Sequence, residues 1–295
     1  MNGLLGPMRL PFLTLVPACV LLGVAVVVHD GGELNTTGVW LALLGALAAS
    51  IAVNTLNEYV DFRSGLDKQT VRTPFSGGSG TLPARPELAR PTLVMAWLSI
   101  GVVVVIGAWL LNERGLTLLP IGIAGIVLIV FYSTWVVRWP LVCLFAPGFG
   151  FGTLMVLGTT LAAGGEITTT AIAASLIPLF LVNNLLLLNQ FPDVDADRDV
   201  GRKTLPIVIG RRAASDVYLL FVLLGALSLG ISIWLGWLPA ATMIGGIGFV
   251  LALPVFFGAR RYSRDIDRLK PWLALNTIVC LATTLLVAGG LYWSV

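Results

Sequence analysis

Long apolar segments recur along the whole chain and are separated by short polar stretches. They lie at about 10–28, 38–56, 92–111, 116–136, 141–162, 170–190, 216–235, 238–257 and 271–292. Each approaches the roughly 20 residues with which an α-helix crosses a hydrocarbon core of about 30 Å. The segments lack the alternation of apolar and polar residues that a transmembrane β-strand requires. The pattern predicts an all-α membrane protein with nine spanning helices.

Composition supports the same class. Of the 295 residues, 57% are hydrophobic and 11% are charged, whereas soluble domains carry about 25% charged residues. The mean hydropathy is +0.93. These values indicate an integral membrane protein, and we expect residues 1–295 to form a single domain. The segment 10–28 is longer than the apolar region of a typical signal peptide, so we interpret it as the first spanning helix.

The distribution of positive charge predicts the orientation. Seventeen of the 18 Lys and Arg residues fall in the N-terminal segment and alternate loops, and only Arg114 falls on the other side. Cytoplasmic loops retain positive charge, so the N-terminus is expected in the cytoplasm and the C-terminus outside, in a prokaryotic cytoplasmic membrane. Long loops at about 57–91, 191–215 and 258–270 fall on this cytoplasmic side and are expected to carry function. The net charge of +3 thus reflects topology, and without a long basic run we expect no nucleic-acid partner.

The three cysteines and the single histidine do not predict a metal or redox centre. Cys19, Cys143 and Cys280 lie far apart, inside or beside apolar segments, and no C-x-x-C spacing occurs. They are therefore interpreted as core thiols. His29 has no second histidine with which to build a zinc site.

A first acidic stretch follows the second apolar segment and reads NEYVDFRSGLD from Asn57 to Asp67. Residues four apart share a helix face, so Asn57 and Asp61 are expected to align. Gly65 is expected to end the helix and to let the chain fold Asp67 back. The stretch therefore offers one amide and two carboxylates at a membrane-edge helix end.

A second acidic stretch follows the sixth apolar segment and reads NQFPDVDADRDVGRKT from position 189 to 204. By the same spacing Asn189, Asp193 and Asp197 share a face, whereas Asp195 and Asp199 point elsewhere. Proline at position 192 predicts a kink or break near the end of the sixth span.

Two opposed groups of this kind predict a magnesium site on a diphosphate. Mg²⁺ prefers oxygen ligands and commonly joins one or two carboxylates to substrate phosphates. The expected metal ligands are Asn57, Asp61, Asp67, Asn189, Asp193 and Asp197. The side chains expected to neutralise phosphate oxygens are Lys68, Arg72, Arg202 and Lys203. For either stretch alone, a solvated acidic loop paired with its own arginines is the alternative, and their joint occurrence on one side of the membrane favours the metal site.

The two stretches together resemble the motifs of the UbiA superfamily of intramembrane prenyltransferases. The resemblance rests on Asn57-x3-Asp61-x5-Asp67, on Asn189-x3-Asp193-x3-Asp197 and on the trailing GRKTL at 201–205. Gly65 before Asp67 is more similar to the 1,4-dihydroxy-2-naphthoate branch of menaquinone synthesis than to the 4-hydroxybenzoate enzymes. Two features depart from the family pattern: Glu58 replaces the usual Asp, and TWVVR at 134–138 replaces a proline-rich stretch.

The resemblance implies a ring of nine helices around a central cavity that opens laterally to lipid, with the three long cytoplasmic loops as cap loops over its polar end. It implies Mg²⁺-dependent transfer of a prenyl group from a polyprenyl diphosphate to an aromatic acceptor, such as 1,4-dihydroxy-2-naphthoate, through an allylic carbocation. Two Mg²⁺ ions would bridge the diphosphate. The implied catalytic residues are Asp61, Asp67, Asp193, Asp197 and Tyr132. Tyr132 would steady the cation, and a residue of the interfacial tyrosine belt is the alternative.

Several alternatives stay open. A membrane terpene cyclase would ionise the same prenyl diphosphate without an acceptor, and a transporter would use acidic residues to bind a coupling ion. Clustering of the acidic residues on one side of the membrane argues against the transporter. Asn183 and Asn184 are either cavity groups or partners in helix-to-helix hydrogen bonds. The glycine-rich stretch 77–80 is either a connector or an anion-facing loop.

Overall fold

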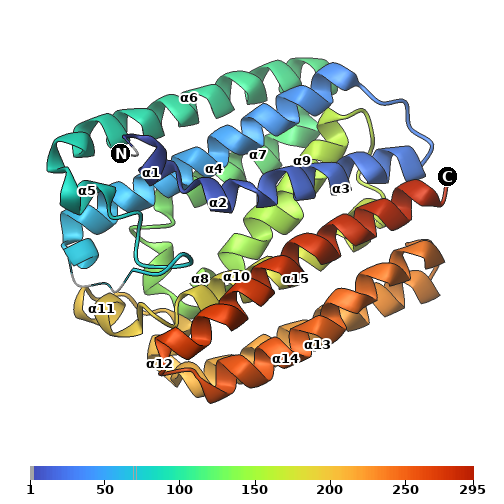
Figure 1. Cartoon of the computed structure of the whole chain (residues 1–295). Coiled ribbons are helices and arrows are strands. Elements are labelled where there is room, and N and C mark those ends of the chain that lie inside the picture. The colour runs from blue at the N-terminus through green and yellow to red at the C-terminus, as the bar shows by residue number, and fades with distance from the viewer. Residues whose placement is uncertain (1–2, 69, 71) are drawn as a thin grey trace.

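The computed structural model describes residues 3–68, 70 and 72–295, except for the side chain of Lys68. Within these residues the secondary structure is entirely helical, which confirms the all-α prediction. The long helices run side by side across the molecule, and the short helices α5, α11 and α12 gather at one end (Figure 1). We call this the capped end.

The helices fall into a long and a short set. In the long set, α8, the π-helix η5 and α9 are each short but follow one another without a gap through the fifth apolar segment. The set comprises α3 (Leu15–His29), α4 (Thr36–Ser64), α6 (Ala89–Arg114), α7 (Leu119–Phe131), α8 (Pro140–Gly148), η5 (Phe149–Leu154), α9 (Met155–Ala162), α10 (Thr169–Asn189), α13 (Arg211–Trp234), α14 (Gly246–Arg261) and α15 (Ile266–Trp293). The short set comprises α1 (Leu5–Met8), α2 (Leu10–Leu13), η1 (Leu66–Lys68), α5 (Thr81–Ala84), η2 (Pro86–Leu88), η3 (Leu116–Leu118), η4 (Val136–Arg138), α11 (Val194–Asp199), α12 (Leu205–Ile209) and η6 (Ala240–Gly245).

Each of the nine apolar segments contains helix, but fewer than nine of these helices are long enough to establish a membrane span. Seven helices of the described chain are long and apolar enough to cross a membrane. An eighth span results if Leu5–Leu13 and Leu15–His29, which meet at a bend of 43°, are counted as one. The remaining segment is the shorter helix Leu116–Phe131, which at 1.5 Å per residue rises only about 24 Å. The count of nine therefore stays a prediction.

Local chemistry explains where several helices begin and end. The side chain of Asn35 caps α4 by accepting from the Gly38 N–H at 2.6 Å, and Thr168 caps α10 from the Ala171 N–H at 3.1 Å. Gly65 ends α4 in the left-handed conformation with φ of 80°, as predicted. Proline at position 192 lies in the predicted break, because α10 ends at position 189 and α11 begins at position 194.

The packing is uneven around the molecule. The largest hydrophobic core joins α3, α10, α13, α14 and α15, and α10 is the most buried of the spanning helices. Close approach of α8 to α10 depends on Gly148, because a Cβ there would lie 2.0 Å from the carbonyl oxygen of Leu179. The helices α4, α6 and α7 share a much smaller cluster around Ala52, Ala96 and Ile129. They form a thin wall beside the main core.

Two asparagines inside α10 join helices. The Asn183 Oδ1 accepts from the Gly148 N–H at 2.6 Å, and the Asn184 Nδ2 donates to the Tyr218 carbonyl oxygen at 3.0 Å. The Tyr218 hydroxyl in turn donates to Asn276 Oδ1 at 2.9 Å. These contacts match the helix-to-helix alternative for Asn183 and Asn184.

The chain alternates between the two ends of the molecule as the charge pattern predicts. The short helices of the expected cap loops lie together at the capped end, and the C-terminus lies at the opposite end (Figure 1). Placement of the capped end in the cytoplasm is still a prediction.

Candidate active site

A cavity of about 740 Å³ lies between the thin wall and α8, η5, α9 and α10. Most of its lining is apolar and comes from the spanning helices. The polar part of the lining lies at the capped end and includes Asn57, Asp61, Asp67, Asn189, Asp193, Asp197 and Arg202. The structure therefore brings all six predicted metal ligands to one cavity.

The first acidic stretch is organised by the end of α4. Asn57 Nδ2 donates to Asp61 Oδ2 at 2.8 Å across one helical turn, and Asn57 Oδ1 accepts from the hydroxyl of Ser133 at 3.0 Å. Beyond the left-handed Gly65, Asp67 lies in η1 and is buried. Burial, together with the nearby Glu58 and Asp61 carboxylates, raises the pKa of Asp67 to about 7.

The second acidic stretch is not a continuous helix. Asn189 is the last residue of α10, Asp193 precedes the first residue of α11, and Asp197 lies within α11. The helix face predicted from spacing holds for Asp193 and Asp197, because the Asp197 N–H donates to the Asp193 carbonyl oxygen at 2.8 Å, one turn away. Asn189 lies before the break and does not share that helix, yet all three side chains line the cavity. Burial, followed by the nearby Asp197, raises the pKa of Asp193 to about 7. Burial raises the pKa of Asp197 to about 6.

Arg202 connects the two stretches. Its Nη2 forms an ion pair with Asp61 Oδ1, and its Nη1 lies 3.0 Å from Asp197 Oδ1. The Arg202 backbone N–H also donates to the Asp197 carbonyl oxygen at 3.0 Å. A single guanidinium thus balances one buried carboxylate from each stretch.

The carboxylates assigned to other roles lie outside the cavity. Asp195 is exposed and pairs with Arg198 at 3.3 Å and Arg211 at 2.9 Å. The hydrogen bond from Arg211, with the charges of both arginines, lowers the pKa of Asp195. Asp199 is exposed as well. This arrangement agrees with the expectation that both point away from Asp193 and Asp197.

The predicted phosphate-binding bases are distributed differently. Of the three whose side chains are described, only Arg202 lines the cavity. Lys203 is exposed, and its backbone N–H donates to the Val137 carbonyl oxygen at 3.0 Å. Arg72 is exposed and packs on Gly80, where a Cβ would lie 2.1 Å from Arg72 Nη1. The side chain of Lys68 lies outside the described part of the structure.

Tyr132 follows the last residue of α7 and lines the cavity near its polar end. The neighbouring Gln190 and Cys143 also line the cavity, and Gln190 Nε2 lies 3.5 Å from Cys143 Sγ. An aromatic face is therefore available close to the two acidic stretches.

The donor set fits Mg²⁺. Among the described residues, no three His, Cys, Asp or Glu side chains form a ready-made metal cluster. However, Asp67 Oδ2, Asp193 Oδ1 and both polar atoms of the Asn189 side chain are buried without a hydrogen-bond partner in the described structure. Buried polar atoms are normally satisfied, so these atoms point to a ligand. Mg²⁺ commonly takes one or two carboxylates and completes its shell with water and substrate phosphate oxygens.

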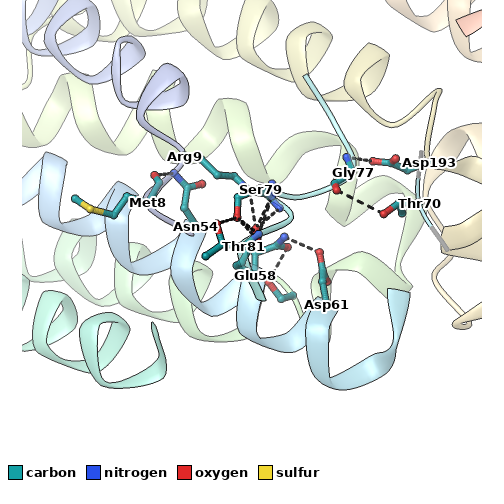
Figure 2. A network of polar contacts seen from close by, with 12 residues as sticks. Met8, Arg9, Asn54, Glu58, Asp61, Thr70, Gly77, Ser79, Thr81 and Asp193 are labelled. Carbon is teal, nitrogen blue, oxygen red and sulfur yellow. Dashed lines mark hydrogen bonds and ion pairs between the residues drawn. The ribbon is translucent and has the colours of Figure 1, made fainter. Parts of the chain in front are cut away.

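Sequence reasoning missed Arg9, which lines the cavity, and a second layer of polar residues behind the lining. Glu58 is fully buried and accepts hydrogen bonds from Arg9 and Ser79. The Gly77 N–H donates to Asp193 Oδ2 at 3.1 Å (Figure 2). The position of Glu58 next to Asn57 could have indicated that Glu58 lies near the site. No spacing rule links Glu58 to Arg9, which lies 49 residues away.

A largely apolar cavity between the long helices, with two acidic stretches at one end, defines a membrane protein with a candidate active site inside its helical bundle. Similarity to known proteins identifies the family. The profile of the UbiA prenyltransferase family matches residues 15–278, and the chain belongs to that family.

One relative of known name is the 1,4-dihydroxy-2-naphthoate octaprenyltransferase of Bacillus subtilis (strain 168), which is 29% identical over 179 residues. The aligned region covers 58% of this chain and 55% of that relative, so the match spans about half the length of the relative.

Solved structures show the same fold at low identity. A UbiA homolog from Archaeoglobus fulgidus bound to DMAPP and Mg²⁺ superposes with a TM-score of 0.68 at 17% identity, over 97% of this chain and 99% of that one. The apo structure of a UbiA homolog from Aeropyrum pernix K1 gives 0.67 at 16% identity, over 94% and 97%. The family profile confirms the family predicted from the two acidic stretches, and the solved structures show that the fold is shared.

Proposed function

We propose that the protein transfers a prenyl group from a polyprenyl diphosphate to an aromatic acceptor. The observation that carries the proposal is the cavity, whose apolar body ends at two acidic stretches joined by Arg202. Its volume of about 740 Å³ lies within the range of roughly 300 to 1,000 Å³ typical of ligand pockets. The diphosphate binds at the polar end, and the prenyl chain extends between the spanning helices.

In this proposal the six amide and carboxylate side chains at the polar end hold Mg²⁺ ions against the diphosphate. Bound Mg²⁺ neutralises the negative charge on the leaving diphosphate. Arg202 contacts the phosphate oxygens from its position between Asp61 and Asp197. Arg72, Lys203 and Lys68 would reach the phosphates only from the cap loops that contain them. We propose that two Mg²⁺ ions bind here and that these three bases assist, and substitution of each base tests its contribution.

The rest of the chemistry follows from the apolar cavity. The carbon–oxygen bond to the diphosphate breaks and leaves an allylic cation, which the water-poor lining protects from hydrolysis. Tyr132 lines the same region, and its aromatic face would stabilise the cation. A ring carbon of the acceptor then forms the new carbon–carbon bond and loses its proton.

The acceptor class rests on the named relative. That relative is a 1,4-dihydroxy-2-naphthoate octaprenyltransferase, so we propose a bicyclic quinone precursor of this kind as the acceptor. We also propose nine spans in a prokaryotic cytoplasmic membrane, with the N-terminus and the polar end of the cavity on the cytoplasmic side and the C-terminus outside.

The test is an assay with purified protein in lipid nanodiscs. Several prenyl diphosphates are combined with 1,4-dihydroxy-2-naphthoate or 4-hydroxybenzoate, with Mg²⁺ or with EDTA, and both prenylated product and released diphosphate are measured. We expect product only with Mg²⁺ and an acceptor, and more with the naphthoate. Hydrocarbon formed without any acceptor would establish the cyclase instead, and no diphosphate release under any condition would overturn the proposal.

A further inference from the structure

Both oxygens of the buried Glu58 carboxylate accept hydrogen bonds from other residues of the protein. Its Oε2 accepts from Arg9 Nε at 3.2 Å and from Arg9 Nη2 at 3.1 Å. Its two oxygens accept from the Ser79 N–H at 3.0 and 3.1 Å, and Oε1 also accepts from the Ser79 hydroxyl. Glu58 is fully buried and is not part of the cavity lining. A carboxylate with these partners joins chain segments by hydrogen bonds and is not placed to bind a metal ion.

Ser79 belongs to a segment that we call the glycine loop, residues 73–80. Thr73 Oγ1 organises its first part by accepting from the Phe75 N–H at 3.1 Å and the Ser76 N–H at 2.9 Å. Gly77 and Gly78 follow in the left-handed region, with φ of 80° and 71°. At Gly78 a Cβ would lie 2.7 Å from Asp67 Oδ1, so only glycine lets the backbone pass this close to Asp67.

The glycine loop reaches both acidic stretches. At one end Ser79 is bound to Glu58 of the first stretch, and two residues earlier the Gly77 N–H donates to Asp193 of the second stretch at 3.1 Å (Figure 2). Gly77 and Asp193 are 116 residues apart in sequence. The position of Asp193 relative to the first stretch therefore depends on where the loop is held.

The N-terminal segment is tied to the same carboxylate. Arg9, between α1 and α2, has φ of 51° and is the sole residue other than glycine with positive φ in the described chain. Such a conformation is uncommon and persists where surrounding contacts hold it. Arg9 forms an ion pair with Glu58. The carbonyl oxygen of the preceding residue, Met8, accepts a hydrogen bond from Asn54 Nδ2 at 3.0 Å.

We propose that Glu58 is a positioning residue, which fixes the glycine loop so that the Gly77 N–H holds Asp193 facing Asp61 and Asp67 across the cavity. The inference rests on the proposed function, because it gives the held geometry a role in binding Mg²⁺ with diphosphate. Metal sites require ligands held by a supporting layer of packed and hydrogen-bonded residues. Glu58 supplies that support without touching the ion.

The test uses the paired substitutions Glu58→Leu and Arg9→Leu, which remove both members of the ion pair. Because Arg9 also lines the cavity, Arg9→Leu alone is measured beside the double variant. Glu87→Gln is the matched control, since Glu87 is an exposed glutamate at the same end of the molecule. Ser79→Ala is a milder variant that removes the hydroxyl, which donates to Glu58 and accepts from the Thr81 N–H at 3.0 Å, and keeps the backbone N–H of position 79. The first measurement is amide hydrogen exchange of Gly77 and Ser79 in metal-free protein, and the second is the Mg²⁺ concentration that gives half-maximal activity.

Loss of a hydrogen bond to a charged group corresponds to about a tenfold effect or more. We expect exchange at Gly77 and at position 79 to become about tenfold faster in the double variant and to be unchanged in Glu87→Gln; in Ser79→Ala exchange at Gly77 should become about fivefold faster. The half-maximal Mg²⁺ concentration should rise about tenfold in the double variant, with a much smaller change in kcat at saturating Mg²⁺. A merely structural role would lower kcat and thermal stability without this selective shift in Mg²⁺ requirement.

Unchanged exchange at Gly77 in the double variant would overturn the proposal, as would faster exchange with an unaltered Mg²⁺ requirement. If the wild-type protein showed no prenyl transfer to any acceptor, the proposed function would fail by itself. Exchange in the metal-free protein would still decide whether Glu58 controls the contact between Gly77 and Asp193. If the double variant did not fold, the exchange rates of Ser79→Ala would decide the same question.

Discussion

Replacing Arg202 by methionine removes the guanidinium that Asp61 and Asp197 share, while keeping a side chain of similar length. The two carboxylates are 4% and 3% exposed, so they have little water to replace the lost partner. Removing one member of a buried ion pair typically destabilises a protein by about 3 to 5 kcal/mol. We expect this loss in metal-free Arg202→Met at pH 8.

Mg²⁺ should reverse much of that loss, because the ion supplies the positive charge that the arginine no longer provides. Binding at a ligand concentration of 100 times Kd stabilises a folded protein by about 2.7 kcal/mol. Saturating Mg²⁺ is therefore expected to restore at least about half of the lost stability. The wild-type protein should gain less, since its Arg202 already balances the two carboxylates.

The assay is thermal unfolding in detergent at pH 8, with EDTA or with Mg²⁺. Taking about 2 °C per kcal/mol for a chain of this size, Arg202→Met should lower Tm by roughly 6 to 10 °C in EDTA. Arg198→Met is the matched control, because Arg198 pairs with Asp195 at the surface, where the side chains are 55% and 72% exposed. Such exposed pairs contribute about 0 to 1 kcal/mol, so its Tm should fall by no more than about 2 °C.

Equal shifts for Arg202→Met and Arg198→Met would refute the reasoning that Arg202 compensates buried charge. A large shift that Mg²⁺ fails to reverse would mean that the ion does not bind between the two acidic stretches.

Three further predictions follow from the geometry of the site. Asp197→Ala should abolish turnover in the prenyl-transfer assay, whereas Asp195→Ala should leave kcat nearly unchanged, because Asp195 pairs with surface arginines outside the cavity. The pKa values of Asp67 and Asp193 lie at about 7 in the folded protein, above the ordinary value of about 3.9. Because the folded protein holds these protons more tightly than the unfolded chain, metal-free protein should lose stability as the pH rises from about 4 to about 7. Binding of Mg²⁺ needs deprotonated ligands, so stabilisation by Mg²⁺ should appear near pH 7 and disappear in acid. Measurements of Tm from pH 5 to 8, with and without Mg²⁺, check both trends. Tyr132→Leu should lower kcat by about tenfold through loss of the aromatic face, and Tyr132→Phe should retain most of the activity.

Each of these has a contrary outcome. Equal loss from Asp195→Ala and Asp197→Ala would contradict the division of the second stretch into cavity-facing and surface carboxylates. A Tm gain from Mg²⁺ that is the same at pH 5 and pH 8 would show that Asp67 and Asp193 do not control binding. Equal activities of Tyr132→Leu and Tyr132→Phe would remove the aromatic face from the mechanism.

Features set by local backbone chemistry were predictable from the sequence. Gly65 ends α4 because glycine adopts the left-handed conformation that a helix end requires, and proline at position 192 interrupts the helix because it lacks the N–H of the ladder. The apolar segments likewise identify the helices, since hydrocarbon leaves little choice of backbone structure. The family followed from the oxygen ligands of the two acidic stretches, whose spacing is specific when they occur together.

Contacts between distant segments were not predictable. The ion pair of Arg9 with Glu58 and the bond from Gly77 to Asp193 form only when the loops fold over the cavity, and they join residues 49 and 116 positions apart. Asn189, Asp193 and Asp197 all line the cavity, but the helical spacing holds only between Asp193 and Asp197, because the break after α10 separates Asn189 from them. Spacing rules describe continuous helices, so they cannot describe what happens beyond a break.

The thin wall of α4, α6 and α7 has a consequence for how this protein can evolve. Gly107, Gly122 and Gly125 line the cavity from this wall, and a Cβ added at any of them meets no heavy atom of another residue within 4 Å. Alanine in place of a mid-helix glycine usually gains about 0.5 to 1 kcal/mol. Single substitutions here can therefore reshape the volume offered to the prenyl chain while the main core is untouched. Substitutions at these positions can therefore change the room for a prenyl tail without lowering stability and without touching the two acidic stretches.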